Sequence, residues 1–437
     1  MHSSRLLKPK ATRPLLSLTT LAILAASPAL QANNDELQLL KQQLEVLQQR
    51  IEQLEQREVP AAESPIARVA EEEATVNVET LSSSREKGSF RIPGTSTSVK
   101  VGGYVKLDAR YSTNGVTGTG GGLTLLRQDV ATQSNDDRDG RAELSARESR
   151  FYIKTTTDLD NGKKVGTYIE GDFFGAGGNE FVSNSFGFRL RQAYATYDRW
   201  LFGQSWTTFM DLNHLGELND FGQHASTIFA RQAQIRYTYP LENGSLMFAV
   251  ENGESLGGTS SDDESTPDFV ARWNHKGDWG SASISGLART LTLDNGTTDD
   301  TKVAGAVSLT GKFKTVGKDD LRLQYNYGAL GRYMGFALFN DTRVDANNEV
   351  DKIDSWGASA AYRHWWTDKS RSTLMYSYAE ADDPANLEDA WTLHANYMYD
   401  LTKTVRVGLE LARKEVTLNG GATRDVTNIH FATRVVF

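Results

Sequence analysis

Hydrophobic and polar residues alternate along the last stretch of the chain, from Asn428 to Phe437. A period of two predicts a β-strand with one face against an apolar environment and the other toward a polar one. The segment from Val99 to Tyr111 has the same pattern, with apolar residues such as Val105 and Leu107 at alternate positions. If these two segments pair, the sheet between them closes on itself and has no free edge. The pattern therefore predicts a barrel.

The sequence between these two segments divides into further strands. Phe151 to Thr155 and Val165 to Phe173 flank Asn161-Gly162, a dipeptide that favours a tight hairpin. We count about 16 strands, at about 21 residues for each strand with its connection. Short periplasmic turns that alternate with longer outer loops are expected for an outer-membrane barrel. The connections expected to be short include Asn243-Gly244 and Asp400 to Thr404, and those expected to be long include Ser112 to Glu143, Gly253 to Thr266, Gly328 to Ile353 and Asn419 to Arg424.

The overall composition would also suit a soluble protein, with 24% charged residues, a net charge of -9 and a mean hydropathy of -0.47. A membrane barrel has similar values because only alternate residues of each short strand meet lipid. A soluble β-sandwich would alternate as well, but it rarely reaches this length. The predicted fold class is all-β: an antiparallel transmembrane β-barrel of about 16 strands over residues 97–437, with an N-terminal periplasmic coiled-coil helix.

The N-terminal residues 1–32 are typical of a secretory signal peptide. Arg5, Lys8, Lys10 and Arg13 give a basic start, and an apolar run follows that is too short to span a bilayer. Residues 29–32 are a plausible cleavage region. The chain has no cysteine, which excludes disulfides, thiolate metal sites and a cysteine nucleophile.

Residues 33–58 have a heptad pattern, which predicts a coiled-coil oligomerisation helix. The seam does not fix the number of helices, and a helix packed on its own barrel is the alternative. Residues 59–96 are rich in proline, glutamate and serine, and they predict a flexible periplasmic linker. The seam residues are Leu37, Leu40, Leu44, Leu47, Ile51 and Leu54.

The polar face of the predicted strands is rich in arginine. A ring of arginines favours anions, because a guanidinium group stays charged and pairs a carboxylate with two hydrogen bonds. The alternative is that many of these arginines pair with acids of the wall and hold the barrel in shape. The acids of the same parity are fewer: Asp108, Glu148, Glu170, Asp172, Glu251 and Glu410. The predicted anion path comprises Arg150, Arg189, Arg191, Arg236, Arg272, Arg322 and Arg363. The other basic residues that alternation assigns to the inward face are Lys100, Lys106, Arg110, Lys154, Arg289, Arg406 and Arg434.

One connection, Phe209 to Thr227, is long enough to fold into the barrel and narrow it. It carries Asp211, His214, Asp220 and His224, but the spacing of the histidines does not predict a metal site. No serine and histidine pair has a spacing that predicts a nucleophile and its base, so we expect no enzyme and no cofactor. The scattered basic residues and the acidic balance also argue against a nucleic-acid binder.

At the level of motifs, the sequence resembles the DcaP-like outer-membrane porins. The resemblance rests on the signal peptide, the heptad and linker, and five segments of the barrel: Val101–Asp108, Phe188–Tyr194, Phe202–Asp211, Asp220–Gly222 and Arg231–Tyr237. It covers essentially the whole mature chain. One departure is Gly222-Gln223-His224, where the family pattern has a Gly-Pro turn.

The resemblance implies a homotrimer of 16-stranded barrels in the outer membrane, with passive uptake of small anions, especially dicarboxylates. It also implies that the segment after Met210 is the constriction loop, that the heptad helps trimerisation, and that Phe437 is part of the signal for barrel assembly. Two alternatives remain open. One is an unselective general porin, and the other is a structural barrel anchor whose coiled coil engages a periplasmic or cell-wall partner.

Overall fold

The computed structural model describes residues 87–437, apart from 114–124, 133–139, 180–182, 223, 258–259, 295–298, 346, 348 and 383–386. The predicted signal peptide (1–32), the coiled coil (33–58) and most of the linker (59–96) lie outside the described residues. Those assignments therefore stay predictions.

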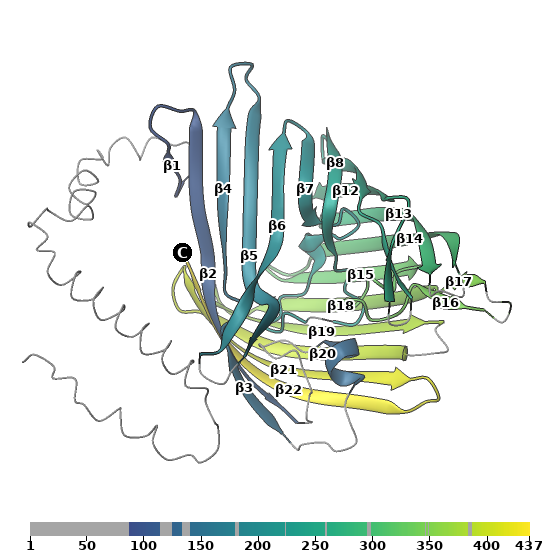
Figure 1. The fold of residues 1–437 in the computed structure, drawn as a ribbon. Coiled ribbons are helices and arrows are strands. Elements are labelled where there is room, and N and C mark those ends of the chain that lie inside the picture. Colours follow the sequence, from purple (N-terminus) through teal and green to yellow (C-terminus); the bar gives the residue numbers. More distant parts are fainter. Residues whose placement is uncertain are drawn as a thin grey trace, which may run out of the picture. The chain divides into compact units, whose positions relative to one another are not determined.

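Sixteen strands of the described chain form a closed antiparallel barrel, in which each strand pairs with the next (Figure 1). The strands are β2 (Thr97–Ser112), β4 (Arg150–Asp158), β5 (Lys164–Asn179), β6 (Ser185–Tyr197), β7 (Trp200–Trp206), β8 (Arg231–Leu241), β9 (Gly244–Glu251), β12 (Asp268–Gly277), β13 (Gly280–Asp294), β14 (Asp299–Lys314), β15 (Asp320–Gly328), β18 (Ser355–Trp365), β19 (Ser370–Ala381), β20 (Leu387–Asp400), β21 (Val405–Leu418) and β22 (Thr423–Val436). The predicted strand number and fold class are confirmed.

The barrel closes between its first and last strands, as the alternating pattern predicts. β2 pairs with β22 from Tyr104↔Val436 to Ser112↔Asn428, and the C-terminus lies beside β2 in Figure 1. The backbone N–H of Phe437 donates to the carbonyl of Gly103 at 3.1 Å, and the N–H of Gly103 donates back at 3.2 Å. The last residue thus completes the hydrogen-bond ladder of the seam.

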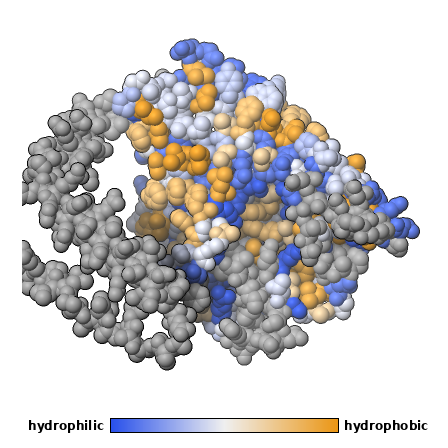
Figure 2. Space-filling model, viewed as in Figure 1, coloured by the Kyte–Doolittle hydropathy of each residue, from blue (hydrophilic) through white to orange (hydrophobic). Residues whose placement is uncertain are grey.

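Side chains alternate between the two faces of the wall. Phe431 is 42% exposed, whereas its neighbour His430 is 1% exposed. Figure 2 shows hydrophobic residues gathered over the outer face of the strands, with hydrophilic residues at the strand ends toward the top of the view. An apolar outer wall is stable only against lipid or another apolar surface, so the sheet is built to stand in a membrane. None of the described helices is long and apolar enough to cross a bilayer.

The connections at one end of the barrel are short, such as Glu242–Asn243 and 366–369. Those at the other end are mostly longer, as predicted. One prediction is wrong: the connection at Asn419 to Arg424 is a tight turn, because β21 and β22 extend to Leu418 and Thr423. The N–H of Leu418 donates to the carbonyl of Ala422 at 2.8 Å, and two glycines with positive φ complete the turn.

The longer connections carry structure of their own. β3 (Arg141–Ser145) extends the pairing of β2, and β1 (Phe90–Arg91), within the predicted linker, pairs with the start of β2. A separate small sheet contains β10 (Glu254–Gly257), β11 (Ser260–Asp263), β16 (Thr342–Val344) and β17 (Val350–Lys352). Two single turns are η1 (Leu126–Val130) and η2 (Leu212–His214).

Candidate functional site

The connection between β7 and β8, which we call the inner loop (207–230), lies inside the barrel. Its base is closed where the N–H of Thr207 donates to the carbonyl of Ala230 at 3.0 Å. Arg272 on β12 donates to the carbonyl of Met210, and Arg322 on β15 donates to that of Leu215. Two guanidinium groups of the wall therefore hold the backbone of the loop.

The middle of the inner loop is attached through Glu217. Its carboxylate accepts hydrogen bonds from Arg371 at 2.7 Å, Arg406 at 2.8 Å and Arg363 at 3.2 Å. Burial acts to raise the pKa of Glu217, but the bond from Arg371 and the three positive charges outweigh it and lower the pKa to about 2. Asp400 pairs with Arg371 and Arg406 as well, so the cluster is an ionic network. We call these three arginines and Glu217 the loop latch.

The next turn of the inner loop is attached to the last strands. The N–H of Asn219 donates to Glu410 at 2.6 Å, and its carbonyl accepts from Lys106 at 2.8 Å. Asp220 pairs with Lys414 at 2.9 Å, and both side chains are buried. Burial would raise the pKa of Asp220, but the positive charges around it, Lys414 foremost, hold that pKa well below its usual range.

The four predicted loop residues take different partners. Asp211 pairs with His214 at 2.9 Å and Asp220 pairs with Lys414, whereas His224 lies 3.2 Å from the hydroxyl of Ser377. Burial lowers the pKa of His224 well below its ordinary value. Among the described residues, no group of three or more His, Cys, Asp or Glu could hold a metal ion. These side chains fix the path of the loop across the interior.

Three predicted arginines gather on the wall of β4, β5 and β6. Arg189 pairs with Asp172 through two hydrogen bonds of 2.9 and 2.8 Å, and Arg191 pairs with Glu170 at 2.7 Å and with Asp172 at 2.8 Å. Arg150 lies 3.9 Å from Glu170. The two acids thus compensate much of the charge of this group.

A β-bulge lies at Arg191 in this group. The register of β5 and β6 shifts so that Glu170 pairs with Gln192 while Gly171 pairs with Leu190, which leaves Arg191 as the extra residue. Arg191 and Gln192 are consecutive, yet both are buried. Alternation along the sequence placed Arg191 inward, but it could not show that Gln192 faces inward as well.

The inner loop inserts Phe221 among the same arginines. Its ring lies 5.3 Å from the guanidinium carbon of Arg191 and 6.0 Å from those of Arg150 and Arg189. Phe229, further along the loop, stacks on Phe336 at 3.8 Å between ring centroids. Aromatic rings of the loop therefore pack against the charged wall and close part of the interior.

The remaining predicted arginines differ in whether a carboxylate neutralises their charge. Arg322 and Arg363 both pair with Asp320, at 2.7 Å and 2.5 Å. Arg236 and Arg272 have no carboxylate within 4.0 Å in the part of the chain that the structure describes, and each has a buried Nε–H without a partner. Wall or loop acids therefore pair with five of the seven arginines and leave two without an ionic partner.

Several residues of this site were missed from the sequence. Glu217 and Phe221 lie within the predicted loop, but neither pairs with a neighbour in sequence, and only the path of the loop reveals their partners. Arg231, at the first position of β8, stacks on Trp206 at 4.9 Å. Asp320 is the first residue of β15 and Arg371 the second residue of β19, and the alternating pattern is hardest to extend to the ends of a strand.

A closed barrel with an apolar outer wall, a polar interior and a loop folded across that interior is the architecture of an outer-membrane porin. The comparisons with known proteins agree. The chain belongs to the DcaP outer membrane protein family, whose model matches residues 24–390. It is a channel protein of the outer membrane and not an enzyme.

Individual relatives support the same class. Porin Omp2a of Brucella ovis is 27% identical over 313 residues, which are 68% of this chain and 87% of the relative. The outer membrane channel DcaP of Acinetobacter baumannii is 24% identical, with a TM-score of 0.71 over 80% of this chain and 99% of that channel. An anion-selective porin from Comamonas acidovorans is 16% identical, with a TM-score of 0.51 over 78% of this chain and all of that porin. Both solved structures are less than 25% identical to this chain and show the fold alone.

Proposed function

We propose that this porin passes small anions in preference to cations, and that dicarboxylates are among its solutes. What supports the proposal is a set of interior arginines that lack an acidic partner within 4.0 Å among the described residues: Arg231, Arg236, Arg272 and Arg434. A guanidinium group stays charged at any pH the cell meets, and it can pair a carboxylate with two hydrogen bonds. Uncompensated positive charge in a narrow interior raises the local concentration of anions.

The preference for two carboxylates is argued from spacing. Arg236 stands on β8 and Arg272 on β12, with β9 between them. Arg236 pairs with Ala249 and Arg272 with Met247, so two strand spacings of about 4.8 Å and an offset of two residues along β9 separate the two positions. Two separated guanidinium groups suit an anion that carries two separated charges. We propose that the inner loop (207–230) sets the size limit, because it crosses the interior beside Arg272.

The test is the reversal potential of the purified protein in a planar bilayer under a potassium chloride gradient, repeated with succinate. We expect anion selectivity for the native chain. A double variant, Arg236→Gln with Arg272→Gln, should move the reversal potential toward that of an unselective pore. The charge-matched control is Arg199→Gln with Lys276→Gln, which removes two exposed cations near the short turns. Cation selectivity of the native chain, or equal shifts in both double variants, would refute the proposal.

A second candidate is an unselective general porin. The observation in its favour is that Arg189, Arg191 and Arg363 are each paired with acids. This candidate expects a reversal potential near zero for the native chain and no block by succinate. The same bilayer experiment therefore separates the two.

We also propose that the protein is a homotrimer held in part by residues 33–58. The support is the heptad seam in the sequence. Deleting residues 33–80 should weaken the trimer in native gels and leave conductance intact. A protein that keeps its oligomeric state after this deletion would contradict the proposed role, and loss of a cell-wall contact without loss of conductance would favour the anchor.

A further inference from the structure

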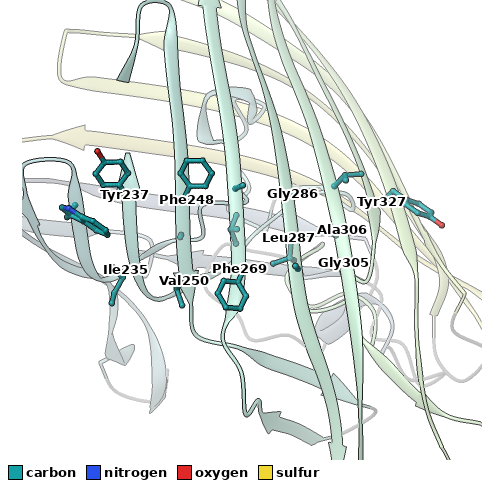
Figure 3. Close-up of a pocket in the computed structure, with 16 residues that line it drawn as sticks. Ile235, Tyr237, Phe248, Val250, Phe269, Gly286, Leu287, Gly305, Ala306 and Tyr327 are labelled. Atoms are coloured by element: carbon teal, nitrogen blue, oxygen red, sulfur yellow. The ribbon is translucent and has the colours of Figure 1, made fainter. Parts of the chain in front are cut away.

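The outer wall of the barrel has a hollow over β12, β13 and β14, where the outward positions carry almost no side chain. Ala271, Gly286, Ala288 and Gly305 occupy these positions. Outward positions on other strands carry large apolar residues, as in β19 to β21. The hollow forms a groove of about 950 Å³ (Figure 3). We call it the outer-wall groove.

The pairing register explains the shape of the outer-wall groove. Two rows of directly paired residues cross the strands, and Figure 3 shows bare ribbon between the large side chains at their ends. One row runs Trp200, Tyr237, Phe248, Ala271, Gly286, Val307 and Tyr327. The other runs Ile235, Val250, Phe269, Ala288 and Gly305. Ala271 and Gly286 are paired in the first row, and Ala288 and Gly305 are paired in the second. Gly286 and Ala288 are successive outward residues of β13, so the hollow is continuous.

The backbone does not require glycine at position 286, whereas position 305 is tighter. A Cβ built on Gly286 would meet nothing within 4 Å, and Gly286 does not have a positive φ. At Gly305 the nearest atom would be the carbonyl oxygen of Leu287, at 3.1 Å. Glycine inside a strand weakens the strand and often marks a place where another molecule approaches closely. At Gly286, therefore, neither packing nor turn geometry explains the open space.

We propose that the outer-wall groove binds an acyl chain of a phospholipid from the periplasmic leaflet. The wall of this outer-membrane barrel faces lipid, and the residues that line the groove include no charged side chain. Trp200 and Tyr237, at one end of the groove, stand beside the short turn 198–199. Short turns mark the periplasmic end of such barrels, and Trp and Tyr favour the headgroup level.

A flexible chain suits this groove better than a second protein wall does. Each atom that fills the hollow gains contact with its floor and sides, and an acyl chain can follow an irregular path to do so. A partner barrel would need a ridge of matching shape and would leave unfilled space without it. The proposal rests only on the membrane placement of the barrel and is independent of solute selectivity.

The test is photo-crosslinking of the full chain in phosphatidylethanolamine–phosphatidylglycerol vesicles. The probe is phosphatidylethanolamine with a diazirine near the end of one acyl chain, at a low mole fraction, and labelled peptides are identified by mass spectrometry. We expect labelling of residues 269–307 to exceed that of β19 to β21 several-fold. The variant Gly286→Leu with Gly305→Leu should lose most of this excess.

The matched control is Ala395→Leu, which enlarges an outward residue of β20 that lies between Leu374 and Leu411. It should leave the labelling of residues 269–307 unchanged. If the double variant fails to fold, the native labelling map still decides. Labelling spread evenly over the wall, or labelling of residues 269–307 no stronger than that of β19 to β21, would overturn the proposal.

Discussion

Replacing Glu217 by glutamine tests whether the loop latch holds the inner loop in place. The substitution keeps the shape of the side chain but removes the negative charge that three guanidinium groups share. Arg371 is almost fully buried and loses its loop partner, while it keeps Asp400 at 2.8 Å. The latch arginines are thus left with less compensation. Two of the four hydrogen bonds go to each carboxylate oxygen, so the amide oxygen of glutamine can keep two of them without the charge, and its NH2 group cannot accept the other two.

The size of the effect follows from the burial of the partners. Breaking a buried ion pair by removing one partner costs about 3–5 kcal/mol. Arg406 is 34% exposed and water screens it, so we take the lower end, about 3 kcal/mol. That value raises the ratio of detached to latched loop by about a hundredfold. The detached state should then become visible as current fluctuation.

Single-channel recording in planar bilayers measures this state. Glu217→Gln should give larger open-channel noise and a higher mean conductance than the native chain, with a shift toward anion selectivity. The control is Glu242→Gln, an exposed acid in the turn between β8 and β9, which changes net charge equally. Native noise, conductance and selectivity in Glu217→Gln would refute the role of the latch.

The latch also has a defined dependence on pH. The pKa of Glu217 is lowered from 4.5 to about 2, so the latch contributes fully above about pH 4.5 and is lost as the pH falls toward 2. In the His224→Asn background, which lacks the titration of that histidine, recordings at decreasing pH should therefore show the noise of Glu217→Gln appear only as the pH falls from about 4.5 toward 2.

Three further predictions follow from single contacts. Burial lowers the pKa of His224 below 6.5, so the inner loop should lose stability as the pH falls below 6.5, by at most about 1.4 kcal/mol per pH unit and only until His224 takes up its proton in the folded loop. His224→Asn should remove this acid sensitivity of the current noise. Lys414→Met leaves Asp220 buried without its ion pair and should cost about 3–5 kcal/mol, measured as urea unfolding in lipid vesicles; equal unfolding midpoints would contradict it. Deleting Phe437 removes its two backbone hydrogen bonds to Gly103 at the seam and should slow barrel assembly. The heat-dependent change of mobility on gels measures the rate of assembly, and an unchanged rate would count against this role.

Much of the fold could be predicted from the sequence because the lipid-facing wall imposes a period of two on every strand. The residues from Val99 to Tyr111 and from Asn428 to Phe437 indicated the closing pair, and their register confirms it. Inward arginines such as Arg236 and Arg272 were found by the same parity. The short length of the connection at 419–422 was not predicted, because local glycine geometry and not alternation sets a turn.

The sequence alone determined that this chain builds a closed barrel whose polar inner face is rich in arginine and lysine. Only the tertiary structure decided which of those cations keep their charge uncompensated. Glu217 meets Arg363, Arg371 and Arg406 from 146 to 189 positions away in the chain, and Arg191 pairs with Glu170 on the neighbouring strand. Alternation is a local property that each strand carries by itself, whereas ion pairing depends on where a folded loop comes to rest against distant strands.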